Sequence, residues 1–283
     1  MRGSDSDTML SFDPDTVPHS EFHRLLVGGV APRPVALVSS MSLDGSNNLS
    51  PFSFFNVFGV NPAVLCFSPA YSGRTGQPKH TMLNILETRE CTVSIVTYDM
   101  VHQISLASAP YDRGVDEFTK SGLTKRPSVK VSPPGVAESP FVMEAKLLHH
   151  LDFGKQPGSA NLMICEVVML HVHKSVLTEK GGIDPVLIDQ VARLGGPYYT
   201  RAKRGLFVLP QPGVPLVGID RLPEEIRSSP ILTGKHLAQL ASLEEIPGDF
   251  IEDDSTIEKR HTAARELLEM DDVEGAWKTL ISR

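Results

Sequence analysis

Apolar and polar residues alternate along several stretches of the first 205 residues, and this period of two predicts half-buried β-strands. Each stretch is bounded by residues typical of turns, such as LDGSNN after the first and KQPGSA between the last two. The predicted strands lie within residues 33–42, 62–69, 91–99, 139–154 and 161–177. Strands of differing length, with one or two intervening helices and turns rich in proline and glycine, favour a closed antiparallel barrel.

Two segments between these strands have helical spacing instead. Residues 80–90 (HTMLNILETRE) place Met82, Leu83, Ile85 and Leu86 at helical spacing and contain neither glycine nor proline. Residues 115–128 predict a short helix that Gly122 ends. We therefore expect a fold that is mainly β with helices, arranged as a closed antiparallel barrel.

The character of the chain changes after Pro210, where a proline-rich stretch is followed by segments of helical periodicity. We interpret residues 211–283 as an extended and helical C-terminal arm, because they contain too few large apolar residues for a core of their own. Residues 21–210 would form the barrel domain, and the polar residues 1–20 a flexible N-terminus.

Composition excludes several classes of protein. The chain has 283 residues with a mean hydropathy of −0.08, and it contains neither a run of about 18 apolar residues nor a signal-peptide pattern. Its three cysteines lie in apolar runs, which indicates buried free thiols in a reducing compartment. We expect a cytoplasmic enzyme that does not associate with membranes.

The net charge of −7 arises entirely after residue 205, where 15 acidic residues face 8 basic ones. Residues 1–205 therefore have no net charge, and the rest of the chain is acidic. This distribution of charge argues against nucleic-acid binding. The usual nucleotide and hydrolase motifs, G-x-G-x-x-G after a strand, Walker A and G-x-S-x-G, are absent from the sequence. The histidine pairs 149–150 and 171–173 have no obvious acidic third ligand, so we predict no metal site and interpret them as strand-surface residues.

Candidate chemistry begins in the loop at residues 68–84 (SPAYSGRTGQPKHTMLN), which leads from a strand into a helix. Hydroxyl and cationic side chains before a helix N-terminus can hold a phosphate. The alternative is a solvated turn in which His80 or Thr81 caps the helix.

Residues 47–69 (NNLSPFSFFNVFGVNPAVLCFSP) add an unusual combination of aromatic and small polar residues. Such a stretch can form a flat apolar slot with hydrogen-bonding groups along its edge, which suits the tricyclic ring of a flavin. For any single phenylalanine, ordinary core packing is the alternative.

The two stretches, in this order, resemble the flavin-reductase-like family of FMN-binding split barrels. The likeness is to the branch with flavoredoxins and the reductase components of two-component monooxygenases, and it spans about residues 25–205. The matching segments are RPVALVSS, NLSPFSFFN, NPAVLCFSP, KHTMLNILETRECTVSI, DEFTKSGLTKRPS, ESPFVMEAKL, CEVVMLHVHKSVL and ARLGGPYYTR. Two residues depart from the family pattern: His80 replaces a usual Asp, and Cys165 replaces a frequent Gly.

The resemblance implies a homodimer with FMN at the subunit interface, and it leaves residues 192–199 (ARLGGPYY) either near the flavin or as interface packing. It identifies no catalytic side chain, because hydride transfer to the flavin ring needs no acid or base. The candidate cofactor residues are Ser53, Phe54, Phe55, Asn56, Ser68, Lys79, His80, Thr81 and Asn84.

The function that follows from the resemblance is an NAD(P)H-dependent flavin reductase whose partner is a monooxygenase or another electron acceptor. Two alternatives stay open: an enzyme that uses tightly held FMN to reduce a small substrate of its own, and an electron carrier without turnover. The sequence does not distinguish NADH from NADPH.

Overall fold

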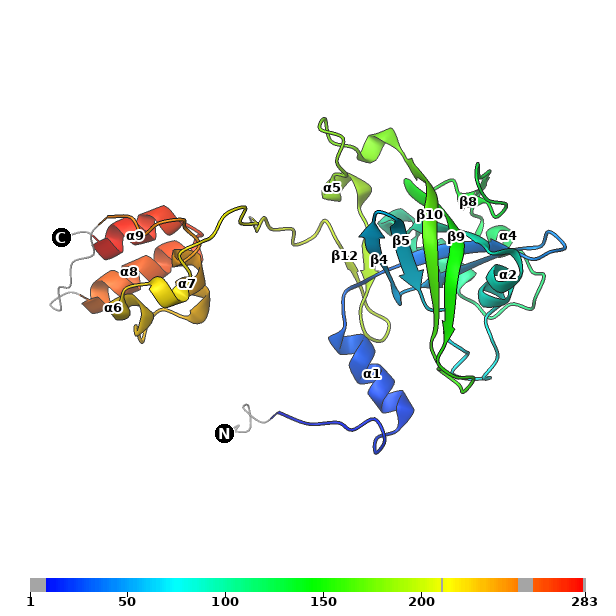
Figure 1. The fold of residues 1–283 in the computed structure, drawn as a ribbon, viewed down its shortest axis with the longest axis horizontal. Coiled ribbons are helices and arrows are strands. Elements are labelled where there is room, and N and C mark those ends of the chain that lie inside the picture. Colours follow the sequence, from blue (N-terminus) through cyan, green and yellow to red (C-terminus); the bar gives the residue numbers. More distant parts are fainter. Residues whose placement is uncertain (1–8, 210, 249–256, 282–283) are drawn as a thin grey trace. The chain divides into compact units, whose positions relative to one another are not determined.

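The computed structural model of the protein describes residues 9–209, 211–248 and 257–281. The chain divides into two compact units, Met1–Leu206 and Phe207–Arg283, each described separately below (Figure 1).

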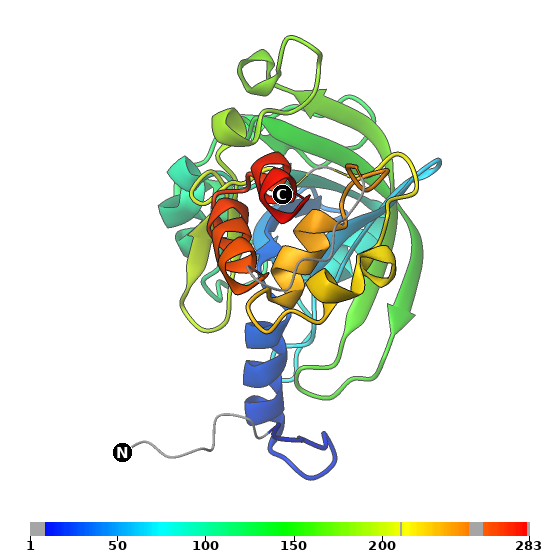
Figure 2. The ribbon, with the colours of Figure 1, turned by 90° about the vertical axis from the view of Figure 1, so that its left-hand side faces the viewer.

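The first unit is built on a seven-stranded sheet in which every neighbouring pair is antiparallel. The strand order is β3-β2-β6-β9-β10-β5-β4. The long strands β9 and β10 carry two register irregularities and bend strongly, as the green arrows of Figure 2 show. The strands are β2 (Ala36–Met41), β3 (Asn47–Phe52), β4 (Phe55–Val60), β5 (Ala63–Phe67), β6 (Glu90–Ile95), β9 (Phe141–Asp152) and β10 (Asn161–Val172).

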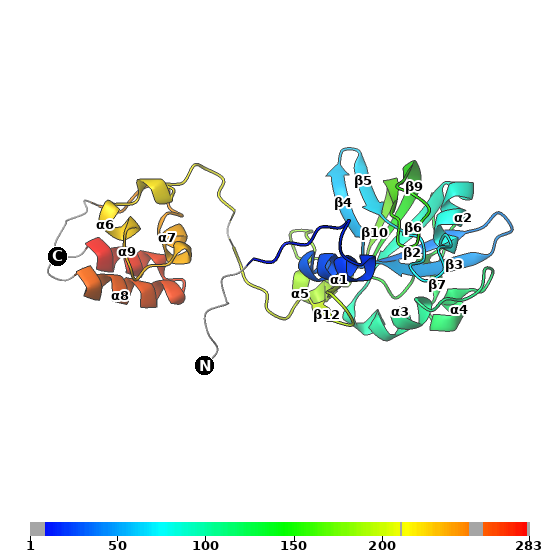
Figure 3. The same ribbon diagram turned by 90° about the horizontal axis from the view of Figure 1, so that it is seen from below.

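Strand β2 shows how the sequence builds two cores from one sheet. Ala36 and Val38 point into one apolar cluster, together with Met82 and Ile85 of helix α2 (His80–Thr88). Leu37, between them, points to the opposite face, because successive side chains of a strand alternate. There it meets α3 (Val101–Ala107) and α4 (Glu117–Ser121), so these helices cover the other face of β2 and β3 (Figure 3).

Two smaller sheets complete this unit. Strands β1 (Arg33–Pro34), β11 (Val191–Arg193) and β12 (Tyr199–Arg201) form one, and β7 (Lys125–Arg126) and β8 (Gly135–Val136) form the other. Helix α1 (His19–Gly29) precedes β1, and the short helix α5 (Pro185–Ile188) precedes β11.

The predicted strands and both predicted helices are present. Helix α2 ends two residues earlier than expected, because Arg89 adopts a left-handed conformation (φ 64°) and β6 begins at Glu90. Gly122 ends α4 at φ 66°, as predicted. Helix α1 begins inside the segment expected to be flexible, since its first residue is His19; residues 1–8 of that segment lie outside the described residues.

The second unit has a core of its own, so the expectation that residues 211–283 contain too few apolar residues for one is wrong. Its helices are α6 (Glu224–Arg227), α7 (Gly234–Leu240), α8 (Ile257–Glu269) and α9 (Val273–Ile281). Trp277 is 1% exposed and donates its indole N–H to the carbonyl of Leu240 over 3.0 Å. The few apolar residues of each helix thus pack together around the side chain of Trp277. A count of apolar residues along the sequence does not reveal this packing. The other members that are at most 1% exposed are Ile226, Leu240, Ala264, Leu268, Ala276 and Leu280.

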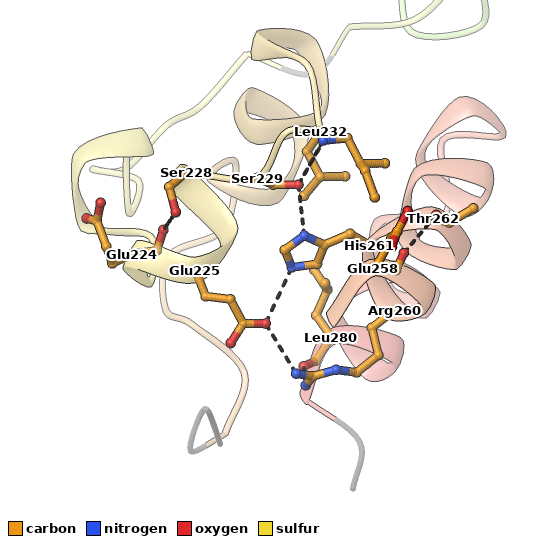
Figure 4. Close-up of polar contacts among 11 residues, drawn as sticks. Glu224, Glu225, Ser228, Ser229, Leu232, Glu258, Arg260, His261, Thr262 and Leu280 are labelled. Atoms are coloured by element: carbon orange, nitrogen blue, oxygen red, sulfur yellow. Dashed lines mark hydrogen bonds and ion pairs between the residues drawn. The ribbon is translucent and has the colours of Figure 1, made fainter. Parts of the chain in front are cut away.

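A buried polar cluster joins α6 to α8 in this unit (Figure 4). His261 Nδ1 lies 2.8 Å from the hydroxyl of Ser229, and its Nε2 lies 3.5 Å from the carboxylate of Glu225, which Arg260 also contacts. Burial, with a smaller contribution from Arg260, lowers the pKa of His261 below its ordinary value. His261 is therefore a neutral link between helices at neutral pH.

The three cysteines, Cys66, Cys91 and Cys165, are buried and unpaired, as predicted. Among the described residues, no helix combines the length and apolar character that crossing a bilayer requires.

Candidate functional site

A cavity of about 470 Å³ opens where β3 leads into β4 and where the loop after β5 begins. Its walls combine the aromatic residues Phe52 and Phe54 with the cations Arg74 and Lys79, and none of the described lining residues is acidic. The lining residues are Ser50, Pro51, Phe52, Ser53, Phe54, Ser68, Ala70, Tyr71, Ser72, Gly73, Arg74, Lys79, Ser108 and Arg193.

A neighbouring cavity of about 190 Å³ extends this space toward the start of α2. The two share Ser50, Ser72, Arg74, Lys79 and Ser108 in their walls. Together they form one groove with an aromatic end and a cationic end, referred to below as the groove. Its size lies within the range of about 300–1,000 Å³ that is typical of small-molecule sites.

Backbone hydrogen bonds fix the aromatic end of the groove. The N–H of Ser68 donates to the carbonyl of Phe54 over 2.9 Å, and the hydroxyl oxygen of Ser68 accepts from the N–H of Asn161 at 3.2 Å. The bend between β3 and β4 is thereby tied to the ends of β5 and β10. Phe54 remains 45% exposed on this fixed backbone, so its ring is available to a flat ligand.

The loop that carries Arg74 closes on itself. The N–H of Ser72 donates to the carbonyl of Gln77 over 2.9 Å, and the N–H of Gly76 donates to the carbonyl of Ser72 over 2.8 Å. Gly76 has φ 66°, a conformation that favours glycine. The closed loop holds the exposed guanidinium of Arg74 at the cationic end of the groove.

The first turn of α2 contributes donors to the same end. Lys79 is the N-cap residue and makes no side-chain capping bond, so the first backbone N–H groups of this nine-residue helix have no side-chain partner there. Lys79, His80 and Thr81 all line the groove. A helix N-terminus beside Arg74 and Lys79 is suited to an anion such as a phosphate.

A chain of buried hydrogen bonds positions this turn. The Thr81 hydroxyl donates to Asn48 Oδ1 over 2.6 Å, and the Asn48 amide donates to Glu117 over 2.8 Å. Glu117 also accepts from the backbone N–H of Leu49 at 2.9 Å. Burial raises the pKa of Glu117, although these hydrogen bonds oppose the shift. The Thr81 side chain therefore anchors the first turn of the helix to β3.

His80 carries little charge at neutral pH. Burial lowers the pKa of its imidazole, and the positive charges of Arg113 and Lys79 lower it further. The cationic end therefore depends on Arg74 and Lys79, whereas His80 offers a neutral hydrogen-bonding ring that a bound anion would favour in its protonated form.

The structure brings six of the nine predicted residues to the groove: Ser53, Phe54, Ser68, Lys79, His80 and Thr81. Phe55 packs against the main core instead. Asn56 is exposed on β4, where its side-chain oxygen accepts from the N–H of Val57 at 2.8 Å. Asn84 lines an adjacent cavity of about 220 Å³ with Asp44 and Arg113, and its Oδ1 has no hydrogen-bond partner among the described residues.

Further residues outside the nine predicted ones also line the groove, among them Asn48, Ser108 and Arg193. Arg193 lies inside the glycine-rich segment ARLGGPYY, which the sequence had singled out as a whole. Ser108 follows α3 in a stretch with no motif, so only the three-dimensional fold reveals it.

Other places in the molecule fit a site less well. A cavity of about 510 Å³ beside α5 mixes acidic and basic side chains, and its Asp189 is already paired with Arg201 and Lys203. Within the described parts of the chain, no three His, Cys, Asp or Glu side chains gather as metal ligands would.

Comparison with known proteins gives a consistent result. The family model described as "Flavin reductase like domain" matches residues 28–195. An uncharacterized protein from Halalkalibacterium halodurans is 36% identical over 194 residues, which cover 67% of this chain and 91% of the relative. The match to the family ends before the second unit begins.

Two solved structures share the fold of the first unit. Nitrilotriacetate monooxygenase component B from Bacillus cereus superposes with a TM-score of 0.67 at 30% identity, over 72% of this chain and all of that one. A protein from Shewanella frigidimarina, whose description names a split barrel domain, gives a TM-score of 0.61 at 25% identity, over 70% of this chain and 96% of that one. The predicted split β-barrel with helices is confirmed.

Proposed function

This chain belongs to the flavin reductase-like family, and on that premise we propose that it binds FMN and uses NADH or NADPH to reduce it. The observation that carries the proposal is the groove, in which an exposed aromatic ring and a cationic helix N-terminus face the same space. A flavin mononucleotide has the matching chemistry, with a flat ring at one end and a phosphate at the other.

The donor set fits each end of this cofactor. Arg74, Lys79, the Ser72 hydroxyl and the free N–H groups of the first turn of α2 would hold the phosphate. Phe54 would lie against the ring, while Ser50 and Ser53 offer hydrogen bonds to its polar edge. Bound FMN supplies a ring that accepts hydride, and the chain contributes binding and orientation.

Among the described residues, Glu117 is the one acidic residue in the walls of the groove, and it is 4% exposed. Its carboxylate accepts hydrogen bonds from the Asn48 amide and from the backbone N–H of Leu49, which gives it a structural role. The cations Arg74 and Lys79 outnumber this one carboxylate, so the net charge at the cationic end is positive.

The proposed recipient of the electrons is a separate protein, such as the oxygenase of a two-component monooxygenase. Support comes from the similarity to nitrilotriacetate monooxygenase component B, whose name describes one part of a larger enzyme system.

We also propose a homodimer. Strand β4 is at the edge of the seven-stranded sheet and exposes Val57, Phe58 and Val60, of which Phe58 is 69% exposed. An apolar edge strand of this kind is usually covered, because it otherwise promotes aggregation. Size-exclusion chromatography with light scattering should give twice the mass of the chain, and Phe58→Lys should give the mass of one.

Titration with FMN tests the central proposal. Quenching of flavin fluorescence should show saturable binding with about one FMN per chain, and NADH or NADPH should be consumed rapidly when free FMN is added. Tight FMN binding with slow consumption would instead favour an enzyme with its own substrate or an electron carrier. A protein without affinity for FMN would contradict the proposal.

A further inference from the structure

A second cavity, of about 330 Å³, adjoins the aromatic end of the groove. It shares Ser53, Phe54 and Arg193 with the groove, and α1 supplies much of its remaining wall. It is referred to below as the arginine pocket. Its lining residues are His23, Arg24, Val27, Arg33, Ser53, Phe54, Arg193, Leu194 and Gly196, none of which is acidic.

Two of its arginines are directly opposed. Arg33 of β1 and Arg193 of β11 are register partners in the antiparallel ladder. Like charges in this position destabilise a sheet, and among the described residues neither guanidinium has an acidic partner within 4.0 Å. The fold therefore maintains an uncompensated positive pair beside Phe54.

Arg33 and Arg193 have different surroundings. Arg33 is 8% exposed, and its guanidinium donates to the carbonyls of Val27, Val30 and Leu194, which locks the end of α1 to the segment after β11. Its buried Nε has no hydrogen-bond partner among the described residues. Arg193 is exposed and has only the ring of Tyr199, 5.6 Å away, as a described side-chain contact.

The pocket wall is built by close packing of two glycines. A Cβ atom on Gly195 would lie 2.9 Å from the Cα of Gly28, a backbone atom that cannot move aside alone. The end of α1 thus approaches the β11–β12 connection more closely than any other residue type would permit. This approach, together with the Arg33 bonds, places His23 and Arg24 of α1 on the same cavity as Arg193.

We propose that the arginine pocket binds phosphate groups of the nicotinamide dinucleotide, with Arg193 and Arg24 as the contacting residues. The inference rests on the proposed function, since the dinucleotide must place its nicotinamide over a flavin held near Phe54. A molecule bound there extends from the shared wall of Ser53 and Phe54 into the pocket. Several guanidinium groups in a cavity without carboxylates suit a multiply charged phosphate, which arginine binds in a bidentate manner.

Binding of oxidised dinucleotides to the FMN-saturated full-length protein tests this without turnover. Calorimetric titration with NADP⁺ and with NAD⁺ should show that Arg193→Gln weakens binding about 10- to 100-fold, as expected for a lost hydrogen bond to a charged group. Arg193→Lys should weaken dinucleotide binding less than Arg193→Gln does, since lysine keeps the positive charge. Arg204→Gln, an exposed arginine of the same unit that does not line the pocket, is the matched control and should bind like the unaltered protein.

The two ligands identify which phosphate is held. A loss confined to NADP⁺ supports contact with its 2′-phosphate, and equal losses for both ligands support contact with the pyrophosphate. If the unaltered protein binds neither dinucleotide, or if Arg24→Gln/Arg193→Gln binds both like the control, the inference is overturned.

A parallel FMN titration separates this inference from the proposed function. Unchanged FMN affinity with unchanged dinucleotide affinity in the double variant would overturn the pocket assignment alone. Absence of FMN binding in the unaltered protein would overturn the proposed function itself. Arg193→Gln should unfold at the same temperature as the unaltered protein or higher, because it removes a like-charge contact, and this excludes misfolding as the cause of weak binding.

Discussion

The hydroxyl of Thr81 donates to Asn48 Oδ1 over 2.6 Å, and this bond joins the first turn of α2 to strand β3. Both side chains are buried, and Asn48 continues the connection to Glu117 of α4. The helix N-terminus proposed to hold a phosphate is therefore fixed by buried side chains that belong to the wall of the groove itself.

Thr81→Val should therefore reduce stability. The variant keeps the shape of the side chain but leaves Asn48 Oδ1 buried without its donor, which costs about 1–3 kcal/mol. Urea denaturation followed by circular dichroism measures the loss. Thr81→Ser retains the hydroxyl, so its free energy of unfolding should fall by less than half as much. Equal losses of stability in both variants would show that packing of the methyl group, and not the hydrogen bond, stabilises this turn.

Lys79→Ala should weaken FMN binding by about 1.5–3 kcal/mol, the range for a hydrogen bond to a charged group. Riboflavin lacks the phosphate, so its binding should change much less. Fluorescence titration with both ligands makes the comparison, and Lys180→Ala, an exposed residue outside the groove, is the control. Equal losses of FMN and riboflavin would place Lys79 in a structural role.

The sequence predicted the local elements well where one short-range rule decides the outcome. The alternation in β2 follows from strand geometry, and the end of α4 at Gly122 follows from the left-handed conformation that glycine favours. The loop before α2 was identified because its hydroxyls, cations and helix start are contiguous in the chain. Most of the candidate groove could be named from these contiguous signals.

Features that depend on distant contacts were not predicted. Asn56 was grouped with Ser53 and Phe54, but strand register directs it to the exposed edge of β4. Arg193 joins the groove through its pairing with β1, some 160 residues earlier in the chain. The core around Trp277 assembles from residues of four helices and of the segments between them, so no single stretch of the sequence predicts it.

Gly195→Ala should destabilise the first unit by about 1–3 kcal/mol, the usual cost of overpacking. The new methyl would meet the backbone of Gly28 at 2.9 Å, so the end of α1 must move. Thermal unfolding monitored by circular dichroism measures the effect. Gly182→Ala is the control, since its methyl would meet Thr178 at an ordinary 3.6 Å; equal melting temperatures of the two variants would show that α1 is not held at this contact.

The second unit should unfold as a separate transition that tryptophan fluorescence reports, because Trp277 is the single tryptophan of the chain. Leu268→Ala removes a fully buried side chain from the core around Trp277 and should cost about 2–5 kcal/mol in that transition. Leu65→Ala, in the core of the first unit, should leave the fluorescence transition unchanged. A fluorescence shift of similar size in both variants would show that the two units unfold together.

The stability of the second unit should also depend on His261. Its pKa in the folded unit lies below the ordinary value of 6.5, chiefly because of burial and then because of Arg260. The unfolded chain therefore binds a proton more readily than the folded unit as the pH falls through about 6.5, and the free energy of unfolding decreases. A single titrating side chain changes the free energy of unfolding by at most about 1.4 kcal/mol per pH unit.

Urea denaturation followed by Trp277 fluorescence between about pH 7.5 and 5.5 measures this dependence. His261→Gln removes the titrating group, so the free energy of unfolding should fall less steeply with decreasing pH, whatever the stability of the variant at pH 7.5. Glu225, 3.5 Å from His261 Nε2, limits the effect, because it would pair with the protonated ring. His102→Gln, an exposed residue of the first unit, should keep the original slope. An identical slope in His261→Gln would mean that Glu225 compensates the burial of the charged ring in full.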